Sequence, residues 1–155
     1  MKKSIFSIVV LTALTFMVGC SSDDDMNQGV PAYLQEGTDS RPTNWTSPNI
    51  ADYEARMSVQ VELGDTLAAY QSSLDLMCAT IDDEVRAVTG PQVTGNVIYY
   101  PLIIFNNGDN KMVSLHYYCD RLHRIYTITN WAVFNTSAAP TGSSGLYRPC
   151  FTSEK

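Results

Sequence analysis

Residues 57–63 alternate between apolar and polar side chains without an error, and this period of two constrains the fold more than any other feature. The apolar members are Met57, Val59, Val61 and Leu63, and the polar ones are Ser58, Gln60 and Glu62. Successive side chains of a β-strand point to opposite faces, so the stretch is predicted to be a strand with one wet face. The same period dominates the chain from residue 52 onward.

Further strand-like runs follow at 97–105, 111–119 and 124–134, rich in β-branched and aromatic residues. Asn107-Gly108 lies between the first two, and Asn-Gly between such runs is a strong hairpin signal. Residues 136–144 have turn composition, and residues 146–151 are a candidate closing strand. Pro101 within the first run indicates a sheet edge or a bulge.

The segment between residues 65 and 85 is ambiguous on periodicity alone. Its apolar residues recur at spacings of three and four, which fits an amphipathic helix as well as strands, and Asp65 could cap such a helix. These residues are Leu67, Tyr70, Leu74, Cys78, Ile81 and Val85. Both interpretations stay open at this point.

The first twenty residues have the organisation of a secretory signal. Lys2 and Lys3 precede an apolar run over residues 5–18, which is too short to span a hydrocarbon core that needs roughly 20 residues. The run ends in Met17-Val18-Gly19-Cys20, which resembles the lipobox of bacterial lipoproteins, with Met17 where leucine is usual. The resemblance implies that residues 1–19 are removed and that Cys20 is acylated on its sulfur and its amine, which gives stable anchoring.

The residues after Cys20 indicate a location. Ser21 is not the aspartate that favours retention in the inner membrane, and residues 21–25 resemble the acidic export signal of Bacteroidetes surface lipoproteins. The resemblance implies a protein that is lipid-anchored in the outer membrane and exposed at the cell surface. The three aspartates of this stretch are also typical of a solvated spacer.

Residues 20–49 are expected to be the lipidated cysteine and a flexible linker, because Gly, Pro, Ser, Thr, Asn and Asp recur there without a sustained period. Trp45 is a candidate for docking on the body. Removal of residues 1–19 leaves eight basic and sixteen acidic residues, a net charge of −8. The chain has no Lys/Arg cluster, so it lacks the electrostatic footprint of a nucleic-acid-binding protein.

Residues 75–88 resemble the signature of a module repeated in Bacteroidetes surface proteins, approximately Asp-x-Leu-x-Ala-Phe-Val-x-Asp-Glu-Val-Arg-Gly-Val. The matching residues are Asp75, Ala79, Ile81, Asp83, Glu84, Val85, Arg86 and Val88, while Thr80 and Ala87 depart from it. Together with residues 115–120 and 124–126, the likeness covers about residues 55–150. It implies a single antiparallel β-sandwich over residues 50–155, with strands at 75–81 and 85–89 and at most a short helix at 66–73. No established catalytic activity attaches to this module.

Three cysteines lie in the body. An exported protein is in an oxidising compartment, so we expect a disulfide between Cys119 and Cys150, with three buried hydrophobic thiols, Cys78 included, as the alternative. Their spacing lacks the C-x-x-C of zinc sites. His116 and His123 carry no signature of a Cys/His nucleophilic pair, so no catalytic residue is assigned.

Two predicted turns, residues 82–84 and 107–110, are rich in Asp, Glu and Asn. At one end of a sandwich they could together supply oxygen ligands for Ca²⁺. Such residues also occur in turns because they tolerate turn geometry and bond to their own backbone. We therefore predict no metal site and no cofactor.

The aromatic residues have recognition potential. Rings on adjacent predicted strands could stack on a sugar or a protein surface, or could instead pair across strands to stabilise the sheet. The candidates are Tyr99, Tyr100, Tyr117, Tyr118, Tyr126 and Trp131. One ring of each tyrosine doublet is expected to point inward and the other outward.

Three functional hypotheses follow. The first is an outer-membrane lipoprotein that displays a non-catalytic β-sandwich for binding or adhesion to a glycan or a protein. The alternative is a structural or accessory subunit of a cell-envelope complex. The third, a small hydrolase, has no nucleophile, base and orienting residue that a motif would identify.

Overall fold

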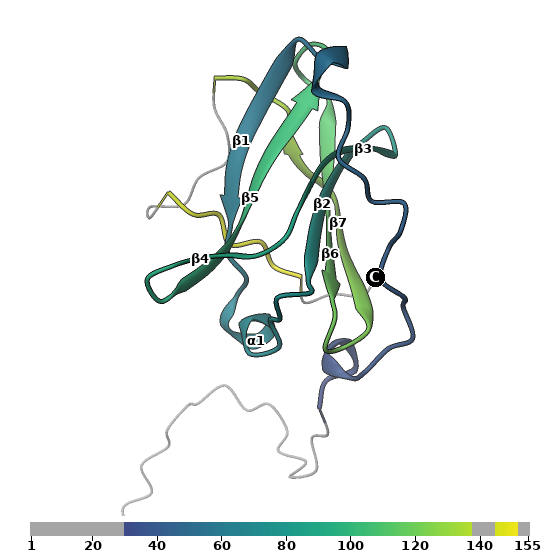
Figure 1. Ribbon diagram of the computed structural model, residues 1–155, viewed down its shortest axis with the longest axis vertical. Coiled ribbons are helices and arrows are strands. Elements are labelled where there is room, and N and C mark those ends of the chain that lie inside the picture. Colours follow the sequence, from purple (N-terminus) through teal and green to yellow (C-terminus); the bar gives the residue numbers. More distant parts are fainter. Residues whose placement is uncertain (1–29, 138–144, 152–155) are drawn as a thin grey trace, which may run out of the picture.

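The computed structural model describes residues 30–137 and 145–151, which fold into two antiparallel sheets packed face to face (Figure 1). One sheet has the strand order β1-β5-β4 and the other the order β3-β2-β6-β7. The expected all-β sandwich is therefore confirmed. Residues 1–29, with the predicted signal peptide and Cys20, lie outside the described residues.

The three-stranded sheet consists of β1 (Ala55–Val61), β4 (Gln92–Thr94) and β5 (Val97–Asn106). The four-stranded sheet consists of β2 (Leu76–Ile81), β3 (Glu84–Thr89), β6 (Met112–Cys119) and β7 (Arg124–Val133). The helical elements among the described residues are α1 (Asp65–Ala68) and the 3-10 turns η1 (Ala32–Leu34) and η2 (Ile50–Asp52). None of these helices is long and apolar enough to cross a membrane.

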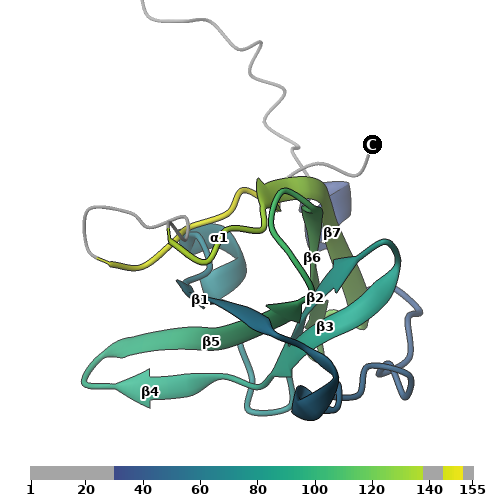
Figure 2. The same ribbon diagram turned by 90° about the horizontal axis from the view of Figure 1, so that it is seen from above.

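The core lies between the inner faces of the two sheets. The alternation predicted for β1 is observed, because Met57, Val59 and Val61 are buried while the residues between them are exposed. Other large core side chains come from both sheets: Met77, Ile81, Tyr100, Leu102, Ile104, Val113, Leu115, Tyr117 and Phe134. Seen from above, the chain passes from β3 in one layer to β4 in the other through residues 90–91 (Figure 2).

The hairpin predicted at Asn107-Gly108 does not form. β5 pairs with β1 and β4, whereas β6 pairs with β2 and β7, so the turn between β5 and β6 connects the two sheets.

The ambiguous segment forms two strands after a single helical turn. Asp82 and Asp83 have φ angles of 52° and 63°, which is the left-handed backbone of a two-residue hairpin turn between antiparallel strands. β2 and β3 pair directly across this turn. The turn geometry therefore separates the strands where a helical spacing of apolar residues would have continued.

Pro101 lies at a local sheet edge, which is one of the two positions, edge or bulge, that the sequence predicts for it. It pairs with Gln60 of β1 on one side, whereas β4 pairs only with Val97, Ile98 and Tyr99 of β5. Beyond Tyr99 the second side of β5 has no ladder partner in the sheet, so the missing N–H of proline removes no ladder hydrogen bond there.

Residues 30–49, here called the strap, contact the body along their length. Gly37 donates a backbone hydrogen bond to Leu122 at 2.7 Å, and Asp39 donates one to His123 at 2.8 Å. Leu34 is buried. The strap contains no strand, in keeping with its linker-like composition, but this described part of the expected linker is hydrogen bonded to the sandwich.

Residues 145–151 return to the body without forming the expected closing strand. Tyr147 makes a single parallel bridge with Val61, through hydrogen bonds that join it to Gln60 and Glu62 at 2.8 and 2.9 Å. Phe151 is 4% exposed, and its ring lies 5.8 Å from that of Tyr117. The bridge and the buried final ring place this segment on the body, together with the side-chain contacts of Tyr147 and Arg148.

The edge strand β7 is irregular. Its register with β6 shifts between Val113, which pairs with Ala132, and Leu115, which pairs with Ile128. Asn130 lies in this bulge with a φ of 51° and donates its backbone N–H to the Ser114 hydroxyl at 3.3 Å.

Candidate functional site

Four of the six predicted recognition rings are buried. Tyr100, Tyr117 and Tyr126 point into the core and are no more than 5% exposed. Tyr118 lies on the outer face of the four-stranded sheet, but it is only 2% exposed there. Alternation predicts which side of a strand a ring occupies, but it does not reveal that another segment covers that side. These four rings are therefore not accessible to a ligand in this structure.

Tyr99 and Trp131 are the two recognition candidates that stay half-exposed. The Trp131 ring lies 5.2 Å from the ring of Tyr147, centroid to centroid, and its Nε1 is buried without a hydrogen-bond partner among the described residues. Trp131 therefore packs against the C-terminal segment, whereas Tyr99 lies on the other sheet.

Asp75, just before β2, is the centre of a buried polar cluster. Its Oδ2 accepts hydrogen bonds from the hydroxyls of Tyr117 at 2.7 Å and Tyr100 at 3.2 Å, and these tyrosines belong to opposite sheets. Ser72 donates through its backbone N and its hydroxyl, and Asp120 donates its backbone N–H at 2.9 Å. At 1% exposure the carboxylate joins the two layers and is closed to a ligand.

The tyrosines of this cluster are poor acids. Burial, and then the nearby charge of Asp75, raises the pKa of Tyr100 above its usual range. Burial also raises the pKa of Tyr117, with Tyr100 and Asp75 as the next causes. Both hydroxyls therefore stay protonated and act as hydrogen-bond donors. The resemblance of residues 75–88 to a repeated module includes Asp75 but gives it no role. An isolated aspartate before a strand does not reveal its hydrogen-bond partners.

The cysteines do not form the expected disulfide. Cys119 carries a free, buried thiol whose Sγ lies 3.7 Å from the carbonyl oxygen of Tyr70, so the structure contains no bridge to Cys150. Cys78 is also a buried free thiol, and burial raises its pKa to about 12. At neutral pH this thiol is protonated and is a weak nucleophile.

His116 lies opposite Cys78 in the β2–β6 ladder, but its ring nitrogens bind other groups. Nε2 lies 3.0 Å from the Thr80 hydroxyl, and Nδ1 lies 2.9 Å from that of Thr127. The ring of Trp45, from the strap, lies 6.0 Å from the imidazole. Burial lowers the pKa of His116, partly opposed by the charge of Asp83. This geometry holds the strap on the sheet and does not activate Cys78.

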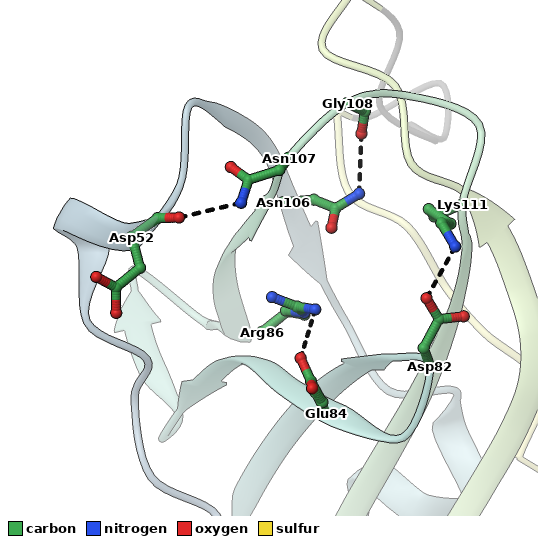
Figure 3. A network of polar contacts seen from close by, with 8 residues as sticks. All are labelled: Asp52, Asp82, Glu84, Arg86, Asn106, Asn107, Gly108 and Lys111. Atoms are coloured by element: carbon green, nitrogen blue, oxygen red, sulfur yellow. Dashed lines mark hydrogen bonds and ion pairs between the residues drawn. The ribbon is translucent and has the colours of Figure 1, made fainter.

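The two oxygen-rich turns meet at the same end of the sandwich (Figure 3). The Nζ of Lys111, after β5, lies 3.0 Å from the Oδ2 of Asp82, between β2 and β3. Arg86 pairs with Glu84 at 2.6 Å, and its guanidinium lies over the Tyr53 ring. The carboxylates thus face cations of the protein itself, and no group of three or more His, Cys, Asp or Glu in the described part of the chain is arranged to hold a metal ion.

A second polar layer at this end ties η2 to the turn after β5. The Asn107 amide donates to the carbonyl of Asp52 at 3.1 Å and accepts from the backbone N–H of Glu54 at 2.9 Å. The Asn106 amide donates to Gly108 within the turn. These contacts close the end of the sandwich opposite Asp75.

The outer face of the three-stranded sheet is open where β5 turns apolar side chains outward. Tyr100, Leu102 and Ile104 face the core, so the residues between them face outward. Of these, Ile103 is 46% exposed. Opposite it and Pro101, β1 presents the exposed side chains of Ser58 and Gln60.

Two adjoining hollows of about 430 and 340 Å³ follow this row and share Gln60. We call them together the β5 groove. The outward-facing or bordering residues of the groove are Ser58, Gln60, Thr94, Val97, Tyr99, Pro101, Ile103, Gly145 and Leu146. None of the described residues that line these hollows is charged.

The Tyr99 ring leans over β4. Its hydroxyl donates to the Oε1 of Gln92 at 3.3 Å and accepts from the hydroxyl of Thr94 at 3.5 Å. Both partners lie on the neighbouring strand, opposite Tyr99 and Val97 in the ladder. The hydroxyl thus contacts two side chains of β4, and Tyr99 contributes to the wall of the groove.

The chain matches no family model, no curated protein and no solved structure.

Proposed function

We propose that this protein is an outer-membrane lipoprotein, anchored through Cys20, that displays the sandwich as a non-catalytic binding module with the β5 groove as its ligand surface. One observation carries the proposal: the strap lies on the outer face of the four-stranded sheet, whereas an apolar row with polar flanks stays open on the other sheet. A concave surface with apolar lining and a few polar groups is typical of ligand sites.

The absence of catalysis in this proposal is supported by the state of the reactive groups. Cys78 is buried and protonated, and both nitrogens of His116 contact threonine hydroxyls. Asp75 is enclosed by five hydrogen bonds. Each of these groups stabilises the fold where it lies.

Anchoring is supported by the lipobox-like residues 17–20 behind a basic and apolar leader. Mass spectrometry of the protein purified from native membranes should find an acylated N-terminal peptide beginning at Cys20. Cys20→Ser should shift the protein out of the membrane fraction. An intact residue 1–19 leader in native material would refute the anchoring.

Binding is tested with the full mature chain carrying Cys20→Ser, offered to arrays of glycans and of envelope proteins. Ile103→Asp places a charge in the groove and should weaken binding of a captured ligand at least about tenfold. Val133→Asp is a matched control, because Val133 on the other sheet is 45% exposed against 46% for Ile103. Equal binding by both variants would contradict the assignment of the groove.

The same variants distinguish the alternative, a structural or accessory subunit of an envelope complex. Crosslinking in intact membranes would then recover a constant partner with wild-type protein and with Ile103→Asp alike. A partner lost only with Ile103→Asp would support the binding module.

A further inference from the structure

We infer that the β5 groove takes an uncharged glycan chain, with one sugar ring stacked on Tyr99 and its neighbours lying along β5 over Pro101 and Ile103. This inference rests on the proposed function and names the ligand class of the same surface. It is carried by three features of the groove: its lack of charge, the position of the Tyr99 ring, and the polar groups on both sides of the apolar row.

The lining chemistry matches a neutral sugar. A sugar ring has a face of C–H groups and a rim of hydroxyls, so it needs an apolar surface flanked by groups that both donate and accept hydrogen bonds. Pro101, Ile103 and Val97 supply the apolar surface. The Ser58 hydroxyl and the Gln60 amide on β1 supply donors and acceptors beside it.

Tyr99 supplies the stacking surface. Its ring lies in the wall of the groove, and its hydroxyl contacts Gln92 and Thr94 of β4. A tyrosine side chain has only two χ angles to order, so it offers a stacking surface at a low cost in conformational entropy. Tyr99 is also the only one of the six recognition candidates that lines a described hollow in this sheet.

The net charge of the protein disfavours acidic polysaccharides and nucleic acids as ligands. The mature chain carries a net charge of −8, which repels acidic polysaccharides and nucleic acids at low salt. The charged side chains beside the groove are Arg56 of β1, opposite Phe105, and Glu62, directly after β1, which binds Arg148 at 2.7 Å. None of them lines the hollows, so the described lining offers no cation to an anionic ligand.

The test uses the full mature chain carrying Cys20→Ser on an array of neutral oligosaccharides together with their uronic-acid and sulfated counterparts. We expect binding to neutral members that changes less than about twofold between about 0.05 and 0.5 M salt, since no charge pair is formed. Tyr99→Ala should weaken this binding at least about tenfold, and Tyr99→Phe should restore most of it because the ring remains. Val133→Asp should bind as wild type.

The outcomes separate the ligand class from the function. Selective binding of acidic glycans, or a protein ligand that depends on Ile103 but not on Tyr99, would overturn this inference and leave the binding module standing. If no ligand of any class responds to substitutions in the groove, both fall. Neutral-glycan binding that Tyr99→Ala leaves unchanged would also overturn the stacking.

Discussion

The Asp75 carboxylate accepts hydrogen bonds from the loop before β2, from both sheets and from the turn after β6. We predict that Asp75→Ala lowers the free energy of unfolding by at least about 3 kcal/mol, because the hydroxyls of Tyr100 and Tyr117 and the N–H of Asp120 lose their acceptor inside the protein. Urea denaturation followed by circular dichroism measures the change.

Asp120→Ala is the control for this prediction. Asp120 reaches the cluster through its backbone N–H, which the substitution keeps. Its effect should stay within about 0.5 kcal/mol, as for an ordinary surface change. Equal losses in the two variants would show that the Asp75 carboxylate does not join the sheets.

We predict that the folded protein loses stability at high pH, because the thiol of Cys78 and the hydroxyls of Tyr100 and Tyr117 are buried. The Cys78 thiol has its pKa raised from 9.0 to about 12 by burial, so above about pH 9 the unfolded chain releases a proton that the folded chain keeps. Its contribution to stability is complete below pH 9 and is lost as the pH rises to 12, at about 1.4 kcal/mol per pH unit. Tyr100 and Tyr117, with raised pKa values, add to the decline above about pH 10.

Urea midpoints measured from about pH 8 to 11 should show this decline. Cys78→Ala should reduce the decline between about pH 9 and 10, where the tyrosines do not yet titrate in the unfolded chain. The part that remains there comes from the Cys119 thiol, whose pKa is also raised by burial. A wild-type midpoint that stays constant over the whole range would contradict the assignment.

The sequence predicts which face of a strand a residue occupies, but it does not predict whether that residue is exposed there. Alternation predicted that Tyr117 and Tyr118 point to opposite faces, and they do. It did not predict that Tyr118 would be buried on the outer face, where Asp39 and Arg41 of the strap lie close enough to affect the pKa of its hydroxyl. The strap is far away in the chain and has no periodic pattern. The groove around Tyr99 was missed for the same reason: Leu146 and Gly145 border it from the C-terminal segment.

Among the elements, the strap depends on a close backbone approach at Gly37. A Cβ at this position would lie 2.7 Å from both the Cγ of Arg124 and the carbonyl oxygen of His123. Gly37→Ala should therefore push the strap away from β7 and speed amide exchange at Asp39, whose N–H bonds to His123, at least about tenfold. Hydrogen exchange with mass spectrometry provides the measurement.

Gly64→Ala serves as the comparison, since a Cβ at Gly64 meets nothing within 4 Å. Exchange in the strap should be unaffected by it. If Gly37→Ala also leaves exchange unchanged, the contact between Gly37 and β7 does not hold the strap.

The strands were more predictable than the segments that connect or cover them. Strict alternation in β1 and the turn at residues 82–84 each constrain local backbone geometry. The Asn107-Gly108 pair predicted a turn correctly but a hairpin wrongly, because local sequence does not reveal that the next strand joins the other sheet. The three residues of β4 are too few to show a period, and the strap is held by contacts between groups far apart in the sequence, such as the Asp39 carboxylate and the N–H of Ile125. Side-chain patterns carry little information about either.

For the whole molecule, the strap limits the distance between anchor and body. If Cys20 is the anchor, only residues 21–29 separate it from Val30, and nine extended residues span at most roughly 30 Å. η1 lies beside the turn after β6, since Gly37 bonds to Leu122. η2 and the turn after β5 lie at the opposite end (Figure 1).

We therefore predict that the turn after β6 faces the membrane. In vesicles carrying a lipid-embedded quencher, a fluorescent amino acid at position 121 should be quenched more strongly than one at position 109, which lies in the turn at the far end. Comparable quenching at both positions would mean that the body lies flat on the lipid or moves freely about the tether.

The bulge in β7 has a consequence for crowding. Lipid anchors gather copies of a protein in two dimensions, where neighbours with regular exposed strand edges can associate into fibrils. Asn130 interrupts that regularity opposite Ser114, so an approaching strand would find hydrogen-bonding groups out of step. If Cys20 anchors this protein, a dense coat of these molecules can thus remain a layer of separate particles.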